Sequence, residues 1–339
     1  MTGLIVLDGT EVRGLFRMPA AIALMREVLA AYSTSGVTQP LRTVVRPEGR
    51  DSVLGSMPAH LATPSLTGFG IKTVVVNPGN AARGLDTHLG VVIVYDPETG
   101  LPAAMMDAAA VTAVRTAAVT AVATDVLAPP DAGDLALVGA GVQARTHLEA
   151  IAEVRPPRRG RGGSRTEAGA ARLAAGAGQH LSLDVEVEVC PTVTETVADA
   201  DIVCTLTSSE TPVLDRGQLR DGAHVNAVGA CFPHTRELAS DVVEKAAVFV
   251  DSLESARAEA GDLLVPIREG RFSENDIRAE LGEVLAGRRP GRVSPAELTV
   301  FKSLGLAAED VAAGLHIAAL ARANGNGTTV DVYTPPPED

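Results

Sequence analysis

The chain has 339 residues, 46% of them hydrophobic, and 42 acidic against 29 basic residues give a formal net charge of −13. This length favours two domains, and the acidic balance argues against non-specific binding to nucleic acid or to an anionic membrane. Three cysteines without paired spacing indicate neither a disulfide framework nor a metal site, and they fit a reducing, cytoplasmic compartment.

The first third of the chain predicts an antiparallel or mixed α+β unit. Residues 4–7 read as a short strand, and residues 19–32 carry apolar side chains at helical spacing. Short β-rich runs separated by Pro, Gly and Asn come next, at residues 43–45, 52–54, 70–76 and 91–95.

Strands and helices alternate in the middle of the chain. An Ala/Val-rich helix is expected over residues 112–127, with Thr112 as its N-cap. Strands are then expected at residues 135–138, 185–189, 202–206, 224–228 and 247–250, with helices at residues 143–152 and 192–198. This alternation predicts a parallel sheet with helical crossovers, and residues 303–323 predict one long apolar-rich helix at the end.

A glycine-rich turn lies between the first of these strands and its helix. Residues 135–144 read LALVGAGVQA, an apolar strand that runs into G-x-G-x-x-A. Gly139 allows the tight turn, Gly141 lets the backbone approach a pyrophosphate, and Ala144 lets the helix pack on the strand. The sequence therefore predicts a dinucleotide site, with Ala140, Val142 and Gln143 also lining it, against an ordinary glycine turn as the alternative.

The cofactor preference depends on the residues that come after this glycine-rich turn. An NAD site usually has an acidic residue about 20 residues further on, which binds the ribose 2′-hydroxyl. The corresponding segment has no acid before Glu167 and holds four arginines, Arg158, Arg159, Arg161 and Arg165. We expect NADP(H), with NAD(H) as the alternative, and contacts from Ser164, Arg165 and Thr166. A solvated loop is the plainer interpretation of these arginines, and the second strand of the nucleotide domain stays unplaced there, because β-forming residues are missing.

Three cations lie in patterned places in the first segment. Lys72 lies inside an apolar strand, where burial is costly unless an anion pairs with it. Arg42 enters a strand, and Arg115 is expected in the first turn of the helix that begins at Thr112, a position suited to a carboxylate. A structural salt bridge or a surface side chain explains each of them taken alone.

Several stretches together resemble the ornithine cyclodeaminase/mu-crystallin family over nearly the full chain. They are QPLR at 39–42, LGSMP at 54–58, GIK at 70–72, VTAVRTAA at 111–118, VGAGVQA at 138–144, VNAVG at 225–229, REL at 236–238 and FKSLG at 301–305.

The resemblance implies a Rossmann domain, residues 119–305, inserted into an α+β domain for substrate binding and dimerisation. That second domain comprises residues 1–118 and is completed by the C-terminal helix in residues 306–339, and the resemblance implies a homodimer. It also implies that Arg42, Lys72 and Arg115 hold a substrate carboxylate, beside Met57. Thr116, Val228 and Gly229 join the expected cofactor contacts.

Two departures separate this chain from the cyclodeaminases that it resembles. Those enzymes carry a catalytic Asp where Cys231 stands here, and a carboxylate shortly before Met-Pro where Gly55 stands here. The chain is more similar to ketimine and imino-acid reductases, which implies reduction of a C=N bond next to a carboxylate, as in Δ1-pyrroline-2-carboxylate or Δ1-piperideine-2-carboxylate. Lys72 is the first candidate for the proton donor, and Cys231 and His234 are the weaker ones.

Three other functions stay open at this point. An alanine-like amino-acid dehydrogenase would use an open-chain 2-oxo acid and an amine. A cyclodeaminase would release ammonia from ornithine or lysine. A non-catalytic protein would hold a nucleotide and a small anionic ligand without turnover.

Overall fold

The computed structural model describes residues 3–166, 169, 171, 173, 175 and 186–332. Contacts divide the chain into unit 1, Met1–Arg115 with Leu306–Asp339, and unit 2, Thr116–Gly305. The first boundary, expected near residue 118, thus lies at residue 115 here. The predicted fold class is confirmed: a Rossmann-like α/β segment interrupts an α+β segment that the C-terminal helix completes.

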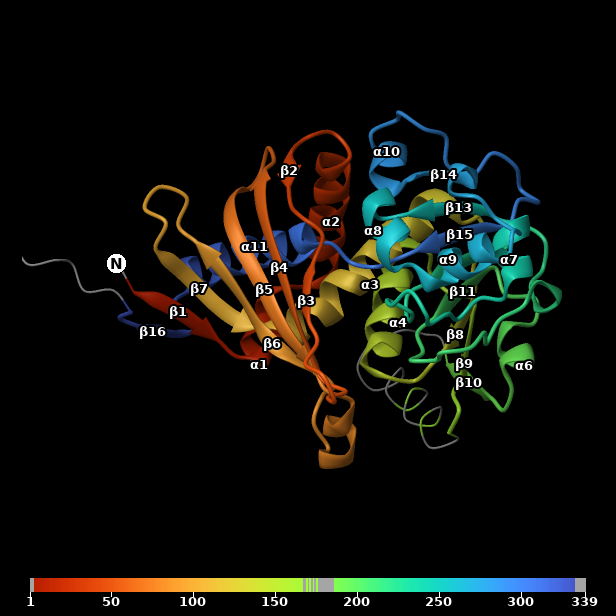
Figure 1. The fold of residues 1–339 in the computed structure, drawn as a ribbon, viewed down its shortest axis with the longest axis horizontal. Coiled ribbons are helices and arrows are strands. Elements are labelled where there is room, and N and C mark those ends of the chain that lie inside the picture. Colours follow the sequence, from red (N-terminus) through yellow and green to blue (C-terminus); the bar gives the residue numbers. More distant parts are fainter. Residues whose placement is uncertain are drawn as a thin grey trace, which may run out of the picture. The chain divides into compact units, whose positions relative to one another are not determined.

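Unit 1 is built on one mixed sheet (Figure 1). Its strands are β1 (Leu4–Leu7), β2 (Val37–Thr38), β3 (Thr43–Val45), β4 (Val53–Ala62), β5 (Thr67–Val76), β6 (His88–Tyr95), β7 (Pro102–Asp107) and β16 (Thr328–Val330). Their order is β16-β1-β7-β6-β5-β4-β2, and β3 also pairs with β4. Only the β1–β7 pair is parallel within this described sheet. The long β4–β5–β6 ladder therefore fixes which side chains share a face.

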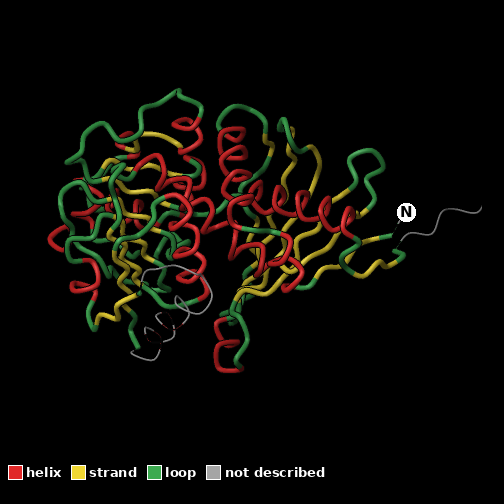
Figure 2. The backbone as a smooth tube through the Cα atoms, turned by 180° about the vertical axis from the view of Figure 1, so that it is seen from behind, coloured by secondary structure: helices red, strands yellow, loops and turns green. Residues whose placement is uncertain are grey.

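Helices cover one face of that sheet. Unit 1 holds α1 (Gly9–Leu15), α2 (Met18–Tyr32), the short 3-10 helix η1 (Pro78–Arg83) and α11 (Ala307–Asn324), and α3 (Ala108–Leu127) begins there. Helix α11 lies across β4, β5 and β6, as the view from behind shows (Figure 2). Small residues permit this close packing, since a Cβ on Gly314 would lie 2.8 Å from Cγ1 of Val94.

Two helix starts differ from the sequence expectation. Helix α3 begins at Ala108, because Oδ1 of Asp107 accepts a hydrogen bond from the Ala110 N–H at 2.6 Å and takes the capping role predicted for Thr112. Arg115 is therefore not in the first turn. Helix α11 begins at Ala307 rather than residue 303, because the preceding apolar run Thr299–Lys302 forms a strand.

Helix α3 is long and apolar enough to cross a membrane by length and composition, but 83% of that stretch is buried inside the protein. It also carries the charged residues Arg115 and Asp125. Helix α3 is accordingly a core helix of the fold.

Unit 2 is a parallel sheet in the order β10-β9-β8-β11-β12-β15-β13-β14. Its strands are β8 (Asp134–Val138), β9 (Arg159–Gly163), β10 (Val187–Cys190), β11 (Ile202–Thr205), β12 (His224–Ala227), β13 (Ala247–Val250), β14 (Ile277–Glu280) and β15 (Thr299–Lys302). Its helices include α4 (Val142–Val154), α6 (Val193–Val197), α7 (Ser240–Lys245), α8 (Leu253–Glu259), α9 (Gly261–Arg268) and α10 (Leu281–Leu285). The order of the first five strands is that of dinucleotide-binding domains. In the strand predicted at residues 185–189, residue 185 lies outside the described residues.

The second strand of this domain is β9, with the sequence RGRGG. Close packing favours glycine at position 163, because a Cβ there would lie 2.2 Å from Oγ1 of Thr196. Arg161 is buried and donates to the carbonyl oxygens of Glu195 and Ala198. The expectation of a solvated loop is therefore wrong for residues 159–163, whereas Arg158 and Arg165 lie outside the strand and are exposed. Pairing with β8 and β10 compensates for the low β propensity of these residues.

Candidate functional site

A buried cluster of charged residues joins three segments of unit 1. Nζ of Lys72 on β5 lies 2.5 Å from Oδ2 of Asp310 on α11. Nε of Arg115 on α3 donates to Oδ1 of the same carboxylate at 3.0 Å. Nη1 of Arg115 donates to Oε2 of Glu309 at 2.8 Å. None of these four side chains is more than 6% exposed, so each charge depends on the others for stabilisation.

Local structure explains why the four side chains meet. Lys72 stands directly opposite Met57 on β4 and Val92 on β6, so all three share the sheet face that α11 covers. The acids lie in the first turn of α11, where the helix dipole favours carboxylates. Gln39 helps to fix that turn, since its Oε1 accepts a hydrogen bond from the Ala308 N–H at 2.9 Å.

The charges of this cluster shift the pKa values of its members. Burial, together with the positive charges of Arg115 and Arg42, lowers the pKa of Lys72 to about 8, although Asp310 opposes the change. Burial alone would raise the pKa of Asp310, but the positive charges of Arg115 and Lys72 hold it below its usual value. Arg42, half-buried just before β3, is thus close enough to act on Lys72. The three predicted cations belong to one electrostatic group.

The predicted glycine turn has the geometry that a pyrophosphate needs. Gly139 has φ 125°, a conformation that favours glycine, and a Cβ there would lie 2.7 Å from the carbonyl oxygen of Leu206. Gly141 forms the N-cap of α4, and a Cβ there would meet nothing within 4 Å among the described residues. Ala144 is fully buried, whereas Gly141 and Val142 are exposed and Ala140 is half-buried. The backbone at the start of α4 is therefore open to a ligand.

Two predicted cofactor residues carry buried polar atoms without a hydrogen-bond partner in the part of the chain that the structure describes. They are Oγ1 of Thr116 on α3 and Oε1 of Gln143 on α4. One turn further along each helix, Nε2 of His147 lies 3.0 Å from Oγ1 of Thr120 and joins the two helices. Buried polar groups are normally satisfied, so the two unpaired atoms fit a polar ligand. The Thr116 hydroxyl can donate to a phosphate, and the Gln143 amide oxygen can accept from a ligand hydroxyl or N–H.

The segment after β9 lies beside the glycine turn, because Gly139 N–H donates to the Gly163 carbonyl at 2.8 Å. Ser164 is half-buried there, and Arg165 and Thr166 are exposed. In this fold the residues at the end of the second strand contact the adenosine ribose. These three residues therefore lie where a ribose 2′-phosphate would bind.

A second buried network, which the sequence does not predict, joins two strand ends of unit 2. Oε1 of Glu237 accepts hydrogen bonds from the N–H and hydroxyl of Thr207 at 2.6 and 2.7 Å, and Oε2 accepts from the Gly229 N–H at 2.7 Å and the Thr205 hydroxyl at 2.8 Å. Asp262 accepts from the backbone N–H of Glu237 and pairs with Lys302 at 3.0 Å. These contacts fix the carboxyl ends of β11 and β12, the edge at which parallel sheets bind cofactors.

The predicted residues at that edge differ in surroundings. A Cβ on Gly229 would lie 2.0 Å from the Thr207 carbonyl oxygen, so this position requires glycine, and Val228 beside it is buried. Cys231 is half-buried, and its Sγ lies 3.6 Å from the Val228 carbonyl oxygen. His234 is exposed and stacks on Phe232 with ring centroids 6.0 Å apart.

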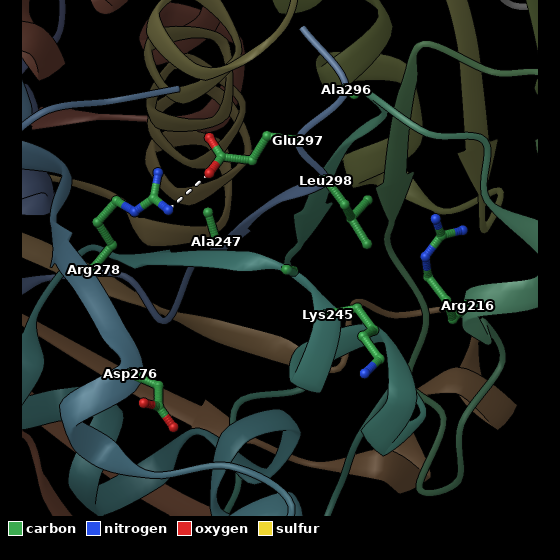
Figure 3. A pocket seen from close by; sticks show the side chains of 9 residues that line it. Arg216, Lys245, Ala247, Asp276, Arg278, Ala296, Glu297 and Leu298 are labelled. Carbon is green, nitrogen blue, oxygen red and sulfur yellow. Dashed lines mark ion pairs between the residues drawn. The ribbon is translucent and has the colours of Figure 1, made fainter. Parts of the chain in front are cut away.

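A cavity of about 440 Å³ lies elsewhere in unit 2. Its lining includes Arg216, Lys245, Arg278 and Glu297, with Arg278 and Glu297 forming an ion pair at 2.7 Å (Figure 3). The lining residues of β13 and β14 stand at the beginnings of those strands, so the cavity is at the amino ends of the sheet. It is therefore distinct from the cofactor edge.

Sequence reasoning identified the cations but not their counter-ions. Glu309 and Asp310 come shortly after the FKSLG stretch and open an apolar helix, and two adjacent acids in the first turn of such a helix were the available signal. Glu237 and Lys302 lie inside stretches that carry the resemblance, without a chemical role that spacing alone reveals.

Comparison with known proteins gives consistent matches along the chain. The model of the ornithine cyclodeaminase/mu-crystallin family matches residues 4–324. Ketimine reductase mu-crystallin of Rattus norvegicus is 40% identical over 282 residues, which cover 82% of this chain and 83% of that protein. The structure of Thermococcus litoralis Δ1-pyrroline-2-carboxylate reductase in complex with NADH and L-proline matches with a TM-score of 0.92 and 33% identity, covering 96% of this chain and 100% of that chain.

An archaeal alanine dehydrogenase dimer with bound NAD matches with a TM-score of 0.91 and 31% identity, covering 97% of this chain and 99% of that chain. The open glycine turn and the unpaired polar atoms beside it make unit 2 the candidate nucleotide-binding unit, and both of these similar structures contain a nicotinamide nucleotide.

Gly141→Ala tests that assignment. The new Cβ meets nothing within 4 Å among the described residues and φ is −81°, so the unfolding midpoint of the ligand-free protein should not change. The methyl group would occupy the space through which a pyrophosphate approaches, and we expect nucleotide affinity to fall about tenfold or more, measured by calorimetry. Unchanged affinity would contradict the assignment. Gln143→Ala, which removes an unpaired buried atom, should also weaken binding.

Proposed function

Because the chain belongs to the ornithine cyclodeaminase/mu-crystallin family, we propose that it is an NAD(P)H-dependent oxidoreductase that reduces a C=N bond adjacent to a carboxylate. The substrate class is a cyclic ketimine such as Δ1-pyrroline-2-carboxylate or Δ1-piperideine-2-carboxylate, and the product is the cyclic amino acid. The observation that carries the proposal is the buried cluster of unit 1, in which Lys72 and Arg115 contact two carboxylates and Arg42 is close enough to lower the pKa of Lys72. Donor groups of this kind suit a substrate carboxylate.

The three cations have different roles in the proposed reaction. Arg115 and Arg42 orient the substrate carboxylate, and correct orientation can contribute up to about 7–11 kcal/mol in ideal cases. The Nζ–H bond of Lys72 breaks as its proton passes to the imine nitrogen, which makes the carbon a better electrophile. A bound NAD(P)H supplies the hydride for that carbon. The C=N π electrons then become the nitrogen lone pair, and Lys72 regains its proton from water.

NADP(H) is the proposed cofactor, and NAD(H) is the alternative. No acidic residue stands at the described end of β9, where Ser164, Arg165 and Thr166 come directly after the strand. A guanidinium and two hydroxyls provide donors for a 2′-phosphate, whereas a carboxylate there would select for the 2′-hydroxyl.

A panel of substrates tests the reaction class. We expect NADPH absorbance to fall with both cyclic imines, and Lys72→Met to lower kcat at least about 100-fold because the proton donor is lost. Lys72→Met should still bind NADPH, which controls for folding. Turnover confined to pyruvate with ammonia or methylamine would favour an amino-acid dehydrogenase instead. Ammonia release from ornithine with NAD⁺ would favour a cyclodeaminase, and nucleotide binding without turnover would favour a non-catalytic protein.

Arg165→Ala tests the cofactor preference. Loss of a charge-assisted contact should raise KM for NADPH about tenfold or more while KM for NADH changes little. Arg289→Ala removes an exposed arginine elsewhere in unit 2 and serves as the matched control. If Arg165→Ala changes KM for NADPH and for NADH equally, Arg165 does not bind the 2′-phosphate.

A homodimer through unit 1 is part of the proposal. On the sheet face opposite α11, exposed apolar residues stand side by side on four strands: Val45, Leu54, Val75 and Leu89. Phe69, on the same face, is 60% exposed. Contiguous exposed apolar surface of this kind is typical of an interface, and the similar alanine dehydrogenase is a dimer.

Phe69→Glu should shift the protein toward a monomer in analytical ultracentrifugation, because a buried unpaired carboxylate is costly at an apolar interface. Val293→Glu is the matched control, since Val293 is 63% exposed in unit 2 and outside that face. A Phe69→Glu protein with the sedimentation of the wild type would place the interface elsewhere.

A further inference from the structure

Lysine is rare in this chain, and two of its lysines are buried. Of 29 basic residues only Lys72, Lys245 and Lys302 are lysines. Lys245 has a side chain that is 63% exposed, whereas Lys72 and Lys302 are buried. A buried ammonium group can release its proton near neutral pH, which a guanidinium does not do. The ammonium group at position 72 therefore provides a proton that a guanidinium in the same place would retain.

Asp310 is the residue that touches both cations of the cluster. Its Oδ2 lies 2.5 Å from Nζ of Lys72, and its Oδ1 accepts from Nε of Arg115 at 3.0 Å. The carboxylate is fully buried, so its position is fixed by these two contacts and by the start of α11. Glu309, in the same turn, binds Nη1 of Arg115 instead.

We propose that Asp310 is a positioning residue that holds Lys72 and Arg115 side by side and keeps Lys72 protonated until the substrate takes its proton. The inference rests on the proposed function, in which Lys72 is the proton donor. Asp310 acts through Lys72 and does not itself touch the substrate. Its two oxygens serve two different cations, which no neutral side chain of this size reproduces.

The surroundings of Lys72 show why one carboxylate has this effect. Among the described residues, the charged and titratable groups near it are Asp310 and Glu309 on α11, Arg115 on α3, Arg42 before β3 and His88 on β6. Burial together with Arg115 and Arg42 lowers the pKa of Lys72, and Asp310 raises it. Removing the Asp310 charge leaves a buried ammonium beside two guanidinium groups, so Lys72 should lose its proton at a lower pH.

Titration of Lys72 in the full-length protein tests the inference. With ¹³C at Cε of lysine the NMR spectrum contains three such signals, and Lys72→Arg assigns the one of interest. Asp310→Asn should lower the midpoint of Lys72 by about 1–3 pH units. The alkaline limb of kcat/KM should move in the same direction, because it reports the free enzyme. Glu309→Gln, which removes a carboxylate that binds only Arg115 among these two cations, should move the midpoint less.

An unchanged midpoint in Asp310→Asn would overturn the inference, as would an equal shift in Glu309→Gln. If Asp310→Asn does not fold, Asp310→Glu decides: the retained charge should keep the midpoint at its wild-type value, and a fall would contradict the electrostatic role. The titration needs no turnover. If the wild-type protein reduces neither cyclic imine, the proposed function is wrong, but the role of Asp310 in the titration of Lys72 can still hold. If the enzyme is active and the Lys72 midpoint is unchanged in Asp310→Asn, only this inference is wrong.

Discussion

A carboxylate shared by two buried cations is the interaction on which unit 1 depends. Asp310 contacts Lys72 and Arg115 with no side chain of the group more than 6% exposed. Removing one partner from such a group leaves an uncompensated buried charge, which costs about 3–5 kcal/mol. The contact also joins segments far apart in sequence, because residue 72 is on a central strand, residue 115 on α3 and residue 310 on the C-terminal helix. The C-terminal segment thus supplies the counter-ions that the front of the chain needs.

In unit 2, buried carboxylates hold the ends of the strands in place. A nucleotide-binding edge needs strand ends that are held in place while their backbone remains open. The buried carboxylates of Glu237 and Asp262 accept hydrogen bonds from backbone N–H groups at these strand ends. The ammonium group of Lys302 offsets part of their negative charge. Burial raises the pKa of Glu237, an effect that Asp262 increases and Lys302 opposes. A ligand could use the positions that stay open. These are Gly141 at the helix start and the unpaired atoms of Thr116 and Gln143.

The sequence predicted the parts whose chemistry is local. The strand, the turn and the helix around Gly139 can be predicted from a pattern in which each residue has a steric reason to be there. The cost of burying Lys72 predicted a counter-ion, but not its identity, because Asp310 lies on a helix that reaches the strand only through the tertiary fold. Strand β9 could not be predicted because Gly and Arg have low β propensity. Its residues form a strand because they pair with two neighbouring strands, β8 and β10. Helix α3 begins before the predicted position because Asp107, and not Thr112, caps it.

A crystal structure of the full-length protein with a nicotinamide nucleotide and L-proline, a cyclic amino acid of the proposed product class, would show whether the charged cluster of unit 1 binds the substrate. We expect the ligand carboxylate to lie within hydrogen-bond distance of Arg115 and Arg42 and the ring nitrogen to lie near Nζ of Lys72, while Lys72 and Arg115 still contact Asp310. A carboxylate bound elsewhere, with the Lys72–Asp310–Arg115 group intact and closed to it, would show that the cluster is structural and would contradict the proposed role.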